Sequence, residues 1–205
     1  MVRAAKDLQI PVIELQHGVI NQYHLGYHYP LTKEMDYFPD EILVWHSMWE
    51  NSADFPLEQS KIKVNQNNHL EKFKERCVRI TEPDSILIIS QGAIGELLSD
   101  YIYQNFERIN KYKIYYKLHP GEFESSKNYK SLLKLDKKLN MEIIRNEKTV
   151  YELFEKVGNV VGVFSTALYE ANYFKKKVFI VPISGFEYMS KLLEKENVEY
   201  FRSIN

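Results

Sequence analysis

The sequence has little of several features that define common protein classes. It holds one cysteine, Cys77, so no disulfide can form within the chain, and this favours a reducing cytosol. No apolar run reaches the length of a membrane span, and the N-terminal residues lack the long apolar stretch of a signal peptide. The 27 basic and 28 acidic residues nearly cancel, which speaks against a general polyanion binder.

The common nucleotide-binding and catalytic motifs are also missing. There is no G-x-x-x-x-G-K-[ST] phosphate loop, no G-x-G-x-x-G fingerprint after a strand and no G-x-S-x-G nucleophile elbow. The segment 90–95, Ser-Gln-Gly-Ala-Ile-Gly, contains glycines but matches none of these patterns well. Cys77 has no activating context in the sequence, so thiol chemistry is not expected.

What the sequence does have is a substantial apolar content and a clear alternation of element types. Hydrophobic residues make up 44% and aromatic residues 14%, enough for a packed core. Apolar runs alternate with segments of helical period, which predicts an α/β fold with a parallel sheet. The expected strands are 11–15, 41–45, 61–64, 86–89, 112–118, 141–145, 159–164 and 178–182. The expected helices are 2–8, 48–54, 92–109, 129–139, 150–156, 167–174 and 188–196.

These elements divide unequally along the chain. Residues 84–205 contain about five strands with their helices, which predicts a complete Rossmann-like, doubly wound domain. Residues 1–55 resemble only the C-terminal part of another such domain, on the acceptor side, and 56–83 form a polar linker. The expectation is a fragment, a truncated homologue, or a subunit that needs a partner domain or a second copy.

Four polar clusters fall where predicted strands end. In open α/β sheets, ligands bind at the carboxyl ends of the strands, so these clusters are the candidate site. They are His17-Gly18, Ser90-Gln91-Gly92, His119-Pro120-Gly121-Glu122 and Ser165-Thr166.

Two of the clusters have the chemistry of a phosphate site. Ser165 and Thr166 stand between a strand and a helix, where free N–H groups and the helix dipole attract anions. His119 can donate a hydrogen bond to a phosphate oxygen or neutralise a departing nucleotide, while Pro120 keeps it extended and Gly121 permits close approach. The alternative interpretations are an ordinary helix cap and a histidine that closes a turn.

Carboxylates near these clusters are candidates for binding the nucleoside. Glu170 lies one helical turn after Thr166, on the same face, and could accept both ribose hydroxyls. Glu122 is the other candidate for contacts with the ribose or base. A solvated surface glutamate is the alternative for Glu170.

The His17-Gly18 cluster begins an aromatic loop. Gly18 permits a sharp turn that would place His17 in a cleft between domains as a general base. The residues after it, including His24 and Tyr27, favour a surface for an acceptor sugar. A zinc site from His17, His24 and His28 fits no standard spacing, so no metal is expected.

Taken together, three motifs resemble those of a known group of enzymes. The order QHG at 16–18, KLHPGE at 117–122 and VGVFSTALYEA at 161–171 resembles bacterial capsule and surface-polysaccharide glycosyltransferases of the GT-B type. Polysialyltransferase-like and sialyltransferase-like enzymes are similar, as are the CDP-glycerol glycerophosphotransferases of teichoic acid synthesis.

The resemblance implies roles for individual residues. A His-Pro motif and a Ser/Thr pair bind the phosphate and ribose of a cytidine-type donor in those families, and a His-Gly in the first domain is proposed as the base. The matching positions are His119, Pro120, Ser165 and Thr166 for the donor, and His17 with Gly18 for the base.

The prediction is therefore a glycosyltransferase that moves a sugar from a CMP- or CDP-linked donor to a capsular or other surface polysaccharide. No cofactor or metal is required, because protein donors can stabilise the leaving phosphate. The alternatives are a catalytically silent nucleotide-binding module and a GT-B-fold nucleotide-sugar epimerase. The expected location is the cytoplasm. Lysines at 127–138 and 175–177 favour solvated faces, with peripheral contact to the inner face of the membrane as the alternative.

Overall fold

The computed structural model describes residues 1–32, 35–65 and 67–204. Residues 33–34 of the aromatic loop, 66 of the polar linker and the terminal 205 lie outside the described residues. The chain divides into two compact units, residues 1–69 and 70–205, and each is described by itself.

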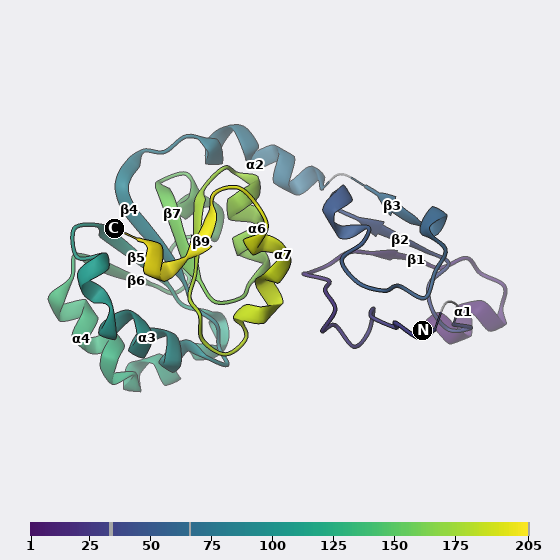
Figure 1. The fold of residues 1–205 in the computed structure, drawn as a ribbon, viewed down its shortest axis with the longest axis horizontal. Coiled ribbons are helices and arrows are strands. Elements are labelled where there is room, and N and C mark those ends of the chain that lie inside the picture. The colour runs from purple at the N-terminus through teal and green to yellow at the C-terminus, as the bar shows by residue number, and fades with distance from the viewer. Residues whose placement is uncertain (33–34, 66, 205) are drawn as a thin grey trace. The chain divides into compact units, whose positions relative to one another are not determined.

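The first unit is built on a small parallel sheet (Figure 1). After helix α1 (Val2–Asp7) come strands β1 (Ile13–Leu15), β2 (Glu41–Val44) and β3 (Ile62–Val64), in the order β1-β2-β3. Short 3-10 turns at Ser47–Trp49 and Gln59–Lys61 connect β2 to β3. The helix expected at 48–54 is thus reduced to a single turn.

The two faces of this sheet are covered differently. Successive strand residues point to opposite faces, and on β2 Ile42 and Val44 are completely buried. The neighbouring strand β1 leaves Ile13 55% and Leu15 62% exposed. These two side chains share a face with Leu43, because Leu15 pairs with Leu43 in the parallel register. One face of the sheet therefore packs into a core and the other stays open.

The second unit is a six-stranded parallel sheet with a Rossmann strand order. Its strands are β4 (Glu82–Ile89), β5 (Lys113–Lys117), β6 (Met141–Ile144), β7 (Val157–Gly162), β8 (Lys177–Ile180) and β9 (Val198–Tyr200). They are arranged β6-β5-β4-β7-β8-β9. Counted from β4, this is the order 3-2-1-4-5-6, which reverses direction between β4 and β7.

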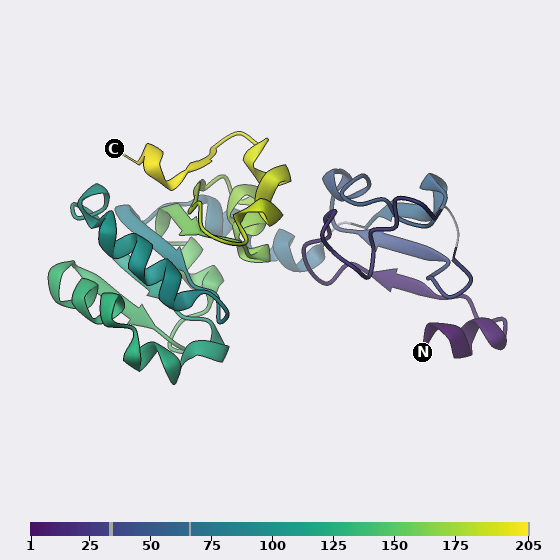
Figure 2. The same cartoon turned by 60° about the horizontal axis from the view of Figure 1, so that its bottom comes forward.

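Helices cover both faces of this sheet. They are α2 (Asn68–Val78), α3 (Gly95–Gln104), α4 (Lys130–Lys138), α5 (Val150–Phe154), α6 (Thr166–Tyr173) and α7 (Ser190–Leu193). Figure 2 shows α3 and α4 packed side by side on one face. Because the sheet is covered on both sides, Ile86, Leu87 and Ile88 of β4 are all completely buried, as a central parallel strand requires.

The structure confirms the parallel α/β fold and corrects several element assignments. The linker 56–83 contains the 11-residue helix α2, and a sixth strand, β9, follows the expected five. The helix expected at 188–196 is a 3-10 turn, Phe186–Met189, followed by the short α7. Among the described residues, no helix is long and apolar enough to cross a membrane.

Candidate functional site

Three of the predicted polar clusters meet at one edge of the second sheet. They follow β4, β5 and β7, which are neighbours in the sheet, and β4 and β7 flank the point where the strand order reverses. The Gln91 side-chain amide donates to the Phe164 carbonyl at 2.5 Å, so it bridges the ends of β4 and β7. A Cβ added to Gly92 would lie 3.1 Å from His119 Nδ1, which places the end of β4 against the end of β5. This edge is the general ligand position of open α/β sheets.

Ser165 and Thr166 form the N-terminus of α6. Ser165 is the N-cap, with an extended backbone and with its Oγ accepting from the Ala167 N–H at 3.2 Å. Thr166 is the first helical residue, and both side chains are half-buried. Ser165 thus caps the helix, which is the ordinary helix-cap interpretation given above as the alternative. Ser165 engages the N–H groups of Ala167 and Leu168, so the Thr166 N–H and the two hydroxyls are the donors left at the sheet edge, where an anion would be stabilised.

His119 is exposed and held in one orientation by its own loop. Its backbone is extended, with φ −72° and ψ 143°, as the following Pro120 requires. Its Nδ1 accepts from the Gly121 N–H at 3.0 Å. A nitrogen that accepts carries no proton, so the neutral ring bears its hydrogen on Nε2. His119 can therefore donate from Nε2 to an anion.

Glu122 does not occupy the position expected of a ligand-binding carboxylate. It is completely buried, and its Oε1 accepts from the His119 N–H at 2.7 Å. The hydrogen bond closes a capping box around the 3-10 turn Pro120–Glu122. In this conformation the carboxylate faces inward and cannot contact a ribose or base.

Glu170 lies on α6, where it was expected, and is half-buried. The Tyr151 hydroxyl donates to its Oε1 at 3.2 Å. Burial raises the pKa of the Glu170 carboxyl above its usual value, and the hydrogen bond from Tyr151 opposes the shift. Tyr151 in turn stacks on Phe73, with ring centroids 4.5 Å apart. Sequence reasoning missed Tyr151, because nothing in a helical tyrosine indicates which carboxylate it contacts.

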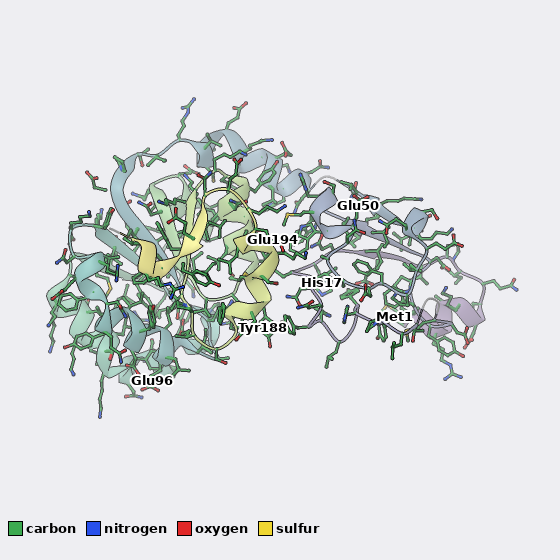
Figure 3. All side chains as sticks on the ribbon, in the orientation of Figure 1. Met1, His17, Glu50, Glu96, Tyr188 and Glu194 are labelled. Atoms are coloured by element: carbon green, nitrogen blue, oxygen red, sulfur yellow. The ribbon has the colours of Figure 1, made fainter. Side chains whose placement is uncertain are left out.

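In the first unit, His17 is exposed and lies beside a carboxylate. Figure 3 shows its side chain on the loop that follows β1. Its Nδ1 is 3.6 Å from Glu14 Oε1, and the same oxygen accepts from the Tyr27 hydroxyl at 2.7 Å. Burial and the Glu14 carboxylate together raise the pKa of Tyr27. Glu14, which sequence reasoning did not single out, thus contacts both His17 and Tyr27.

The remaining acceptor-side residues pack around the contacts of Glu14 with His17 and Tyr27. Tyr27 is 7% exposed, so it belongs to the core of the unit more than to an open surface. The His24 ring lies 4.6 Å from the Tyr27 ring. Gln16 is buried and bonds to the Gly18 carbonyl and to the Trp45 N–H, both at 2.9 Å, which fixes the turn after β1.

The three histidines weighed as zinc ligands have separate partners. His17 lies beside Glu14, His24 Nδ1 accepts from the Gly26 N–H, and His28 Nδ1 accepts from the Asp54 N–H. Over the described ranges, no group of three or more histidine, cysteine, aspartate or glutamate side chains is arranged to hold a metal ion.

Comparison with known proteins supports the fold at low sequence identity. No protein-family model matches the chain, and no curated protein matches it in sequence. The crystal structure of Acinetobacter baumannii MurG matches with a TM-score of 0.51 and 13% identity, over 93% of this chain and 52% of that one. The wall teichoic acid polymerase TagF matches with a TM-score of 0.46 and 14% identity, over 85% of this chain and 50% of that one.

These matches are GT-B glycosyltransferases, and so is TarM, which matches over 85% of this chain with a TM-score of 0.46 and 13% identity. The likeness to MurG shows that the chain has a Rossmann-like fold of the GT-B type. The chain spans about half the length of the MurG and TagF structures.

Proposed function

We propose that this chain binds the donor nucleotide of a glycosyltransferase, with the donor phosphate held by His119, Ser165 and Thr166. The observation that carries the proposal is their position at the ends of β5 and β7, on either side of β4, at the edge where the strand order of a Rossmann sheet reverses. The Gln91 bridge joins the end of β4 to the end of β7. His119 presents an Nε2–H, and the α6 N-terminus presents the Thr166 N–H and the hydroxyls of Ser165 and Thr166. These are donors suited to a phosphate at the moment when it leaves with the nucleotide.

The nucleoside would extend from the phosphate along α6 towards Glu170. An oxygen of the Glu170 carboxyl can accept from ribose hydroxyls, while Tyr151 holds the other side of the same group. A CMP- or CDP-linked donor is the proposed class, following the resemblance of the His-Pro and Ser-Thr motifs to cytidine-dependent enzymes.

His17 is the proposed general base for the acceptor hydroxyl. The Glu14 carboxylate beside its ring would stabilise the imidazolium that forms when His17 takes a proton. The acceptor would be a capsular or other surface glycan, and the lysines of α4 would allow the enzyme to contact anionic lipid. His17 belongs to the first unit of the chain, whereas the proposed donor site belongs to the second.

A catalytically silent nucleotide-binding module is the second candidate. The open face of the first sheet, with Ile13 and Leu15 exposed, favours it. Parallel sheets are normally covered on both faces, so a partner would complete this unit before it could bind an acceptor.

The experiment is calorimetric titration of the purified chain with CMP, CDP, UMP and UDP. Cytidine nucleotides should bind saturably, and His119→Ala should weaken them about 10- to 100-fold, because a hydrogen bond to a charged group contributes about 1.5–3 kcal/mol. His69→Ala, at an exposed histidine of α2, is the matched control and should change nothing. Absence of binding by the folded wild type would reject the donor site, and binding without turnover would favour the silent module.

A further inference from the structure

We propose that Glu122 is a positioning residue: a socket formed by Gly92 and Gly95 receives the His119 ring and the Glu122 carboxylate, and Glu122 fixes His119 as an Nε2–H donor. The ligand of that donor, a nucleotide phosphate, rests on the function proposed above. The positioning itself is a property of the folded chain and can be tested without any ligand.

The first step is the closed set of hydrogen bonds around His119. Its N–H donates to Glu122 Oε1 at 2.7 Å, its carbonyl accepts from the Glu122 N–H at 3.0 Å, and its Nδ1 accepts from the Gly121 N–H at 3.0 Å. Pro120 fixes the backbone between them. The ring is exposed, yet every polar atom of His119 except Nε2 has a partner within four residues.

The second step is the shape of the socket. A Cβ added to Gly95 would lie 1.7 Å from Glu122 Oε2, far closer than the 3.0 Å below which non-bonded contacts of a Cβ essentially never occur. A Cβ added to Gly92 would lie 3.1 Å from His119 Nδ1. One glycine therefore makes room for the carboxylate, and the other makes room for the ring. Neither has positive φ, so space, and not backbone conformation, requires them.

The third step is the setting of the inner carboxylate oxygen. Glu122 Oε2 is buried, with no hydrogen-bond partner among the described residues. Ser90 Oγ lies 3.1 Å from the same added Cβ of Gly95, so both oxygens border one point. Tyr116 is buried close by, where burial raises the pKa of its hydroxyl and Ser90 opposes the rise. The His119 N–H holds Oε1 by a hydrogen bond, and packing against Gly95 determines where Oε2 lies.

These contacts show that segment 90–95 packs against the His119–Glu122 loop, which its sequence pattern does not indicate. Its two glycines do not follow a phosphate-loop pattern, and both of them receive the His119–Glu122 loop from the neighbouring strand. Because free imidazole exchanges its proton between both nitrogens, holding it on Nε2 prepares His119 to donate outward. The entropy cost of orienting the His119 ring is then incurred when the chain folds and not when the phosphate binds.

The first test is nitrogen-15 NMR of the full chain at about pH 8, where an ordinary imidazole is neutral. His119→Ala assigns the ring signals. We expect protonation at Nε2 and a scalar coupling between the Gly121 amide nitrogen and His119 Nδ1 across their hydrogen bond. An Nδ1–H tautomer or an absent coupling in the wild type would overturn the proposal.

The second test compares Gly95→Ala with Gly158→Ala. At Gly158 an added Cβ would meet only the side chain of Ile80, at 3.2 Å, so this variant is the matched control. Gly95→Ala should abolish the coupling and weaken CMP binding about tenfold, the effect of one lost charge-assisted hydrogen bond. Glu122→Gln, which keeps an acceptor oxygen, should retain both.

The two proposals fail separately. If the wild type binds no nucleotide, the proposed function fails, and the tautomer and coupling still decide the role of Glu122. If Gly95→Ala folds and keeps both the coupling and the CMP affinity, Glu122 is not a positioning residue. If Gly95→Ala does not fold, Glu122→Ala is measured in its place, and the same result leads to the same conclusion. Loss of both in Gly158→Ala would also reject the specific role of the socket.

Discussion

At the scale of single residues, the site shows why a motif predicts position better than role. His119, Ser165 and Thr166 lie at one sheet edge because each follows a buried parallel strand, and that much follows from hydrophobic runs alone. The role of Glu122 could not be predicted, because Glu122 is buried by the glycines of a segment far away in sequence. Tyr151 was missed for the same reason, because contacts between elements leave no local pattern. Glu14 lies only three residues before His17, so that contact was within reach of the sequence, whereas the contact of Glu14 with Tyr27 was not.

The two functions of Ser165 can be separated by substitution. Ser165→Asp keeps an N-cap acceptor and suits the helix dipole, so the thermal stability should stay close to that of the wild type. It also places a negative charge where the donor phosphate should bind, so CMP binding should fall at least tenfold. Ser165→Ala should instead lower stability by about 1 kcal/mol, through loss of the cap. Unchanged CMP affinity in Ser165→Asp, measured by calorimetry, would remove Ser165 from the site.

Glu170 should make stability depend on pH in the opposite sense to a paired surface carboxylate. Its pKa is raised in the folded state, so its protonated form is favoured there and the wild type loses stability as pH rises through that pKa. Glu170→Gln should therefore raise the melting temperature by a few degrees at neutral pH, and this gain should vanish in acid. Glu152→Gln is the control, because the Thr149 backbone and hydroxyl lower the pKa of Glu152 and predict destabilisation at neutral pH. A parallel response of both variants would contradict the assignment.

At the scale of elements, the long apolar strands were predictable and the short ones were not. Strands β4, β5 and β7 are buried on both faces and appear in the sequence as continuous apolar runs. Strand β9 has three residues, Val198–Tyr200, and pairs with β8 only after the chain has returned along α7. The sequence of helix α2 resembles a polar linker because Lys, Glu and Arg make up five of its 11 residues, and only Leu70 and Cys77 of the helix are buried.

The loop between α6 and β8 contains a buried charge that should cost stability. Lys176 is 1% exposed, and its Nζ lies 3.4 Å from the Arg79 carbonyl oxygen. Burial lowers the pKa of Lys176 from 10.5 to about 8. Between these values the unfolded chain binds more protons than the folded one, so wild-type stability should rise with pH across this window.

Replacing this lysine tests the effect directly. Lys176→Met keeps the length and removes the charge, so it should stabilise the chain at pH 7 by roughly 1–3 kcal/mol, since each pKa unit corresponds to about 1.4 kcal/mol. Urea unfolding at several pH values measures the effect, and the gain should shrink as pH rises from about 8 towards 10.5. Lys175→Met, at the exposed neighbouring lysine, should show no such trend. A destabilised Lys176→Met with unchanged pH dependence would contradict the buried-charge interpretation.

At the scale of the whole molecule, the two units differ in the size of their sheets and in how the faces are covered. The second has all six strands of the Rossmann order and a core covered on both faces. The first has a three-stranded sheet with one open face. The expectation of an unequal division rests on the two clear apolar runs within 1–55 and the five within 84–205. Which strands pair with which could not be predicted, since parallel pairing joins residues that are distant along the chain.

Contact with an anionic membrane should depend on the exposed lysines of α4. Lys130, Lys134 and Lys137 recur at i, i+4 and i+7 and are all exposed. Each contributes about 1 kcal/mol near an anionic surface, so changing all three to glutamate should reduce binding to phosphatidylglycerol vesicles by roughly 100-fold. Co-sedimentation at low and high salt measures this, with phosphatidylcholine vesicles as control. Equal sedimentation of wild type and variant would leave these lysines as a solvated face.

The Gln91 bridge has a consequence for the time course of binding. Because its side chain already joins the ends of β4 and β7, an incoming phosphate meets an assembled edge and needs no loop to close first. Stopped-flow mixing with CMP should then give a single exponential whose rate grows linearly with ligand concentration. In Gln91→Ala the ends of β4 and β7 would have to come together before the phosphate binds. This step would add a slow phase whose rate does not depend on the CMP concentration.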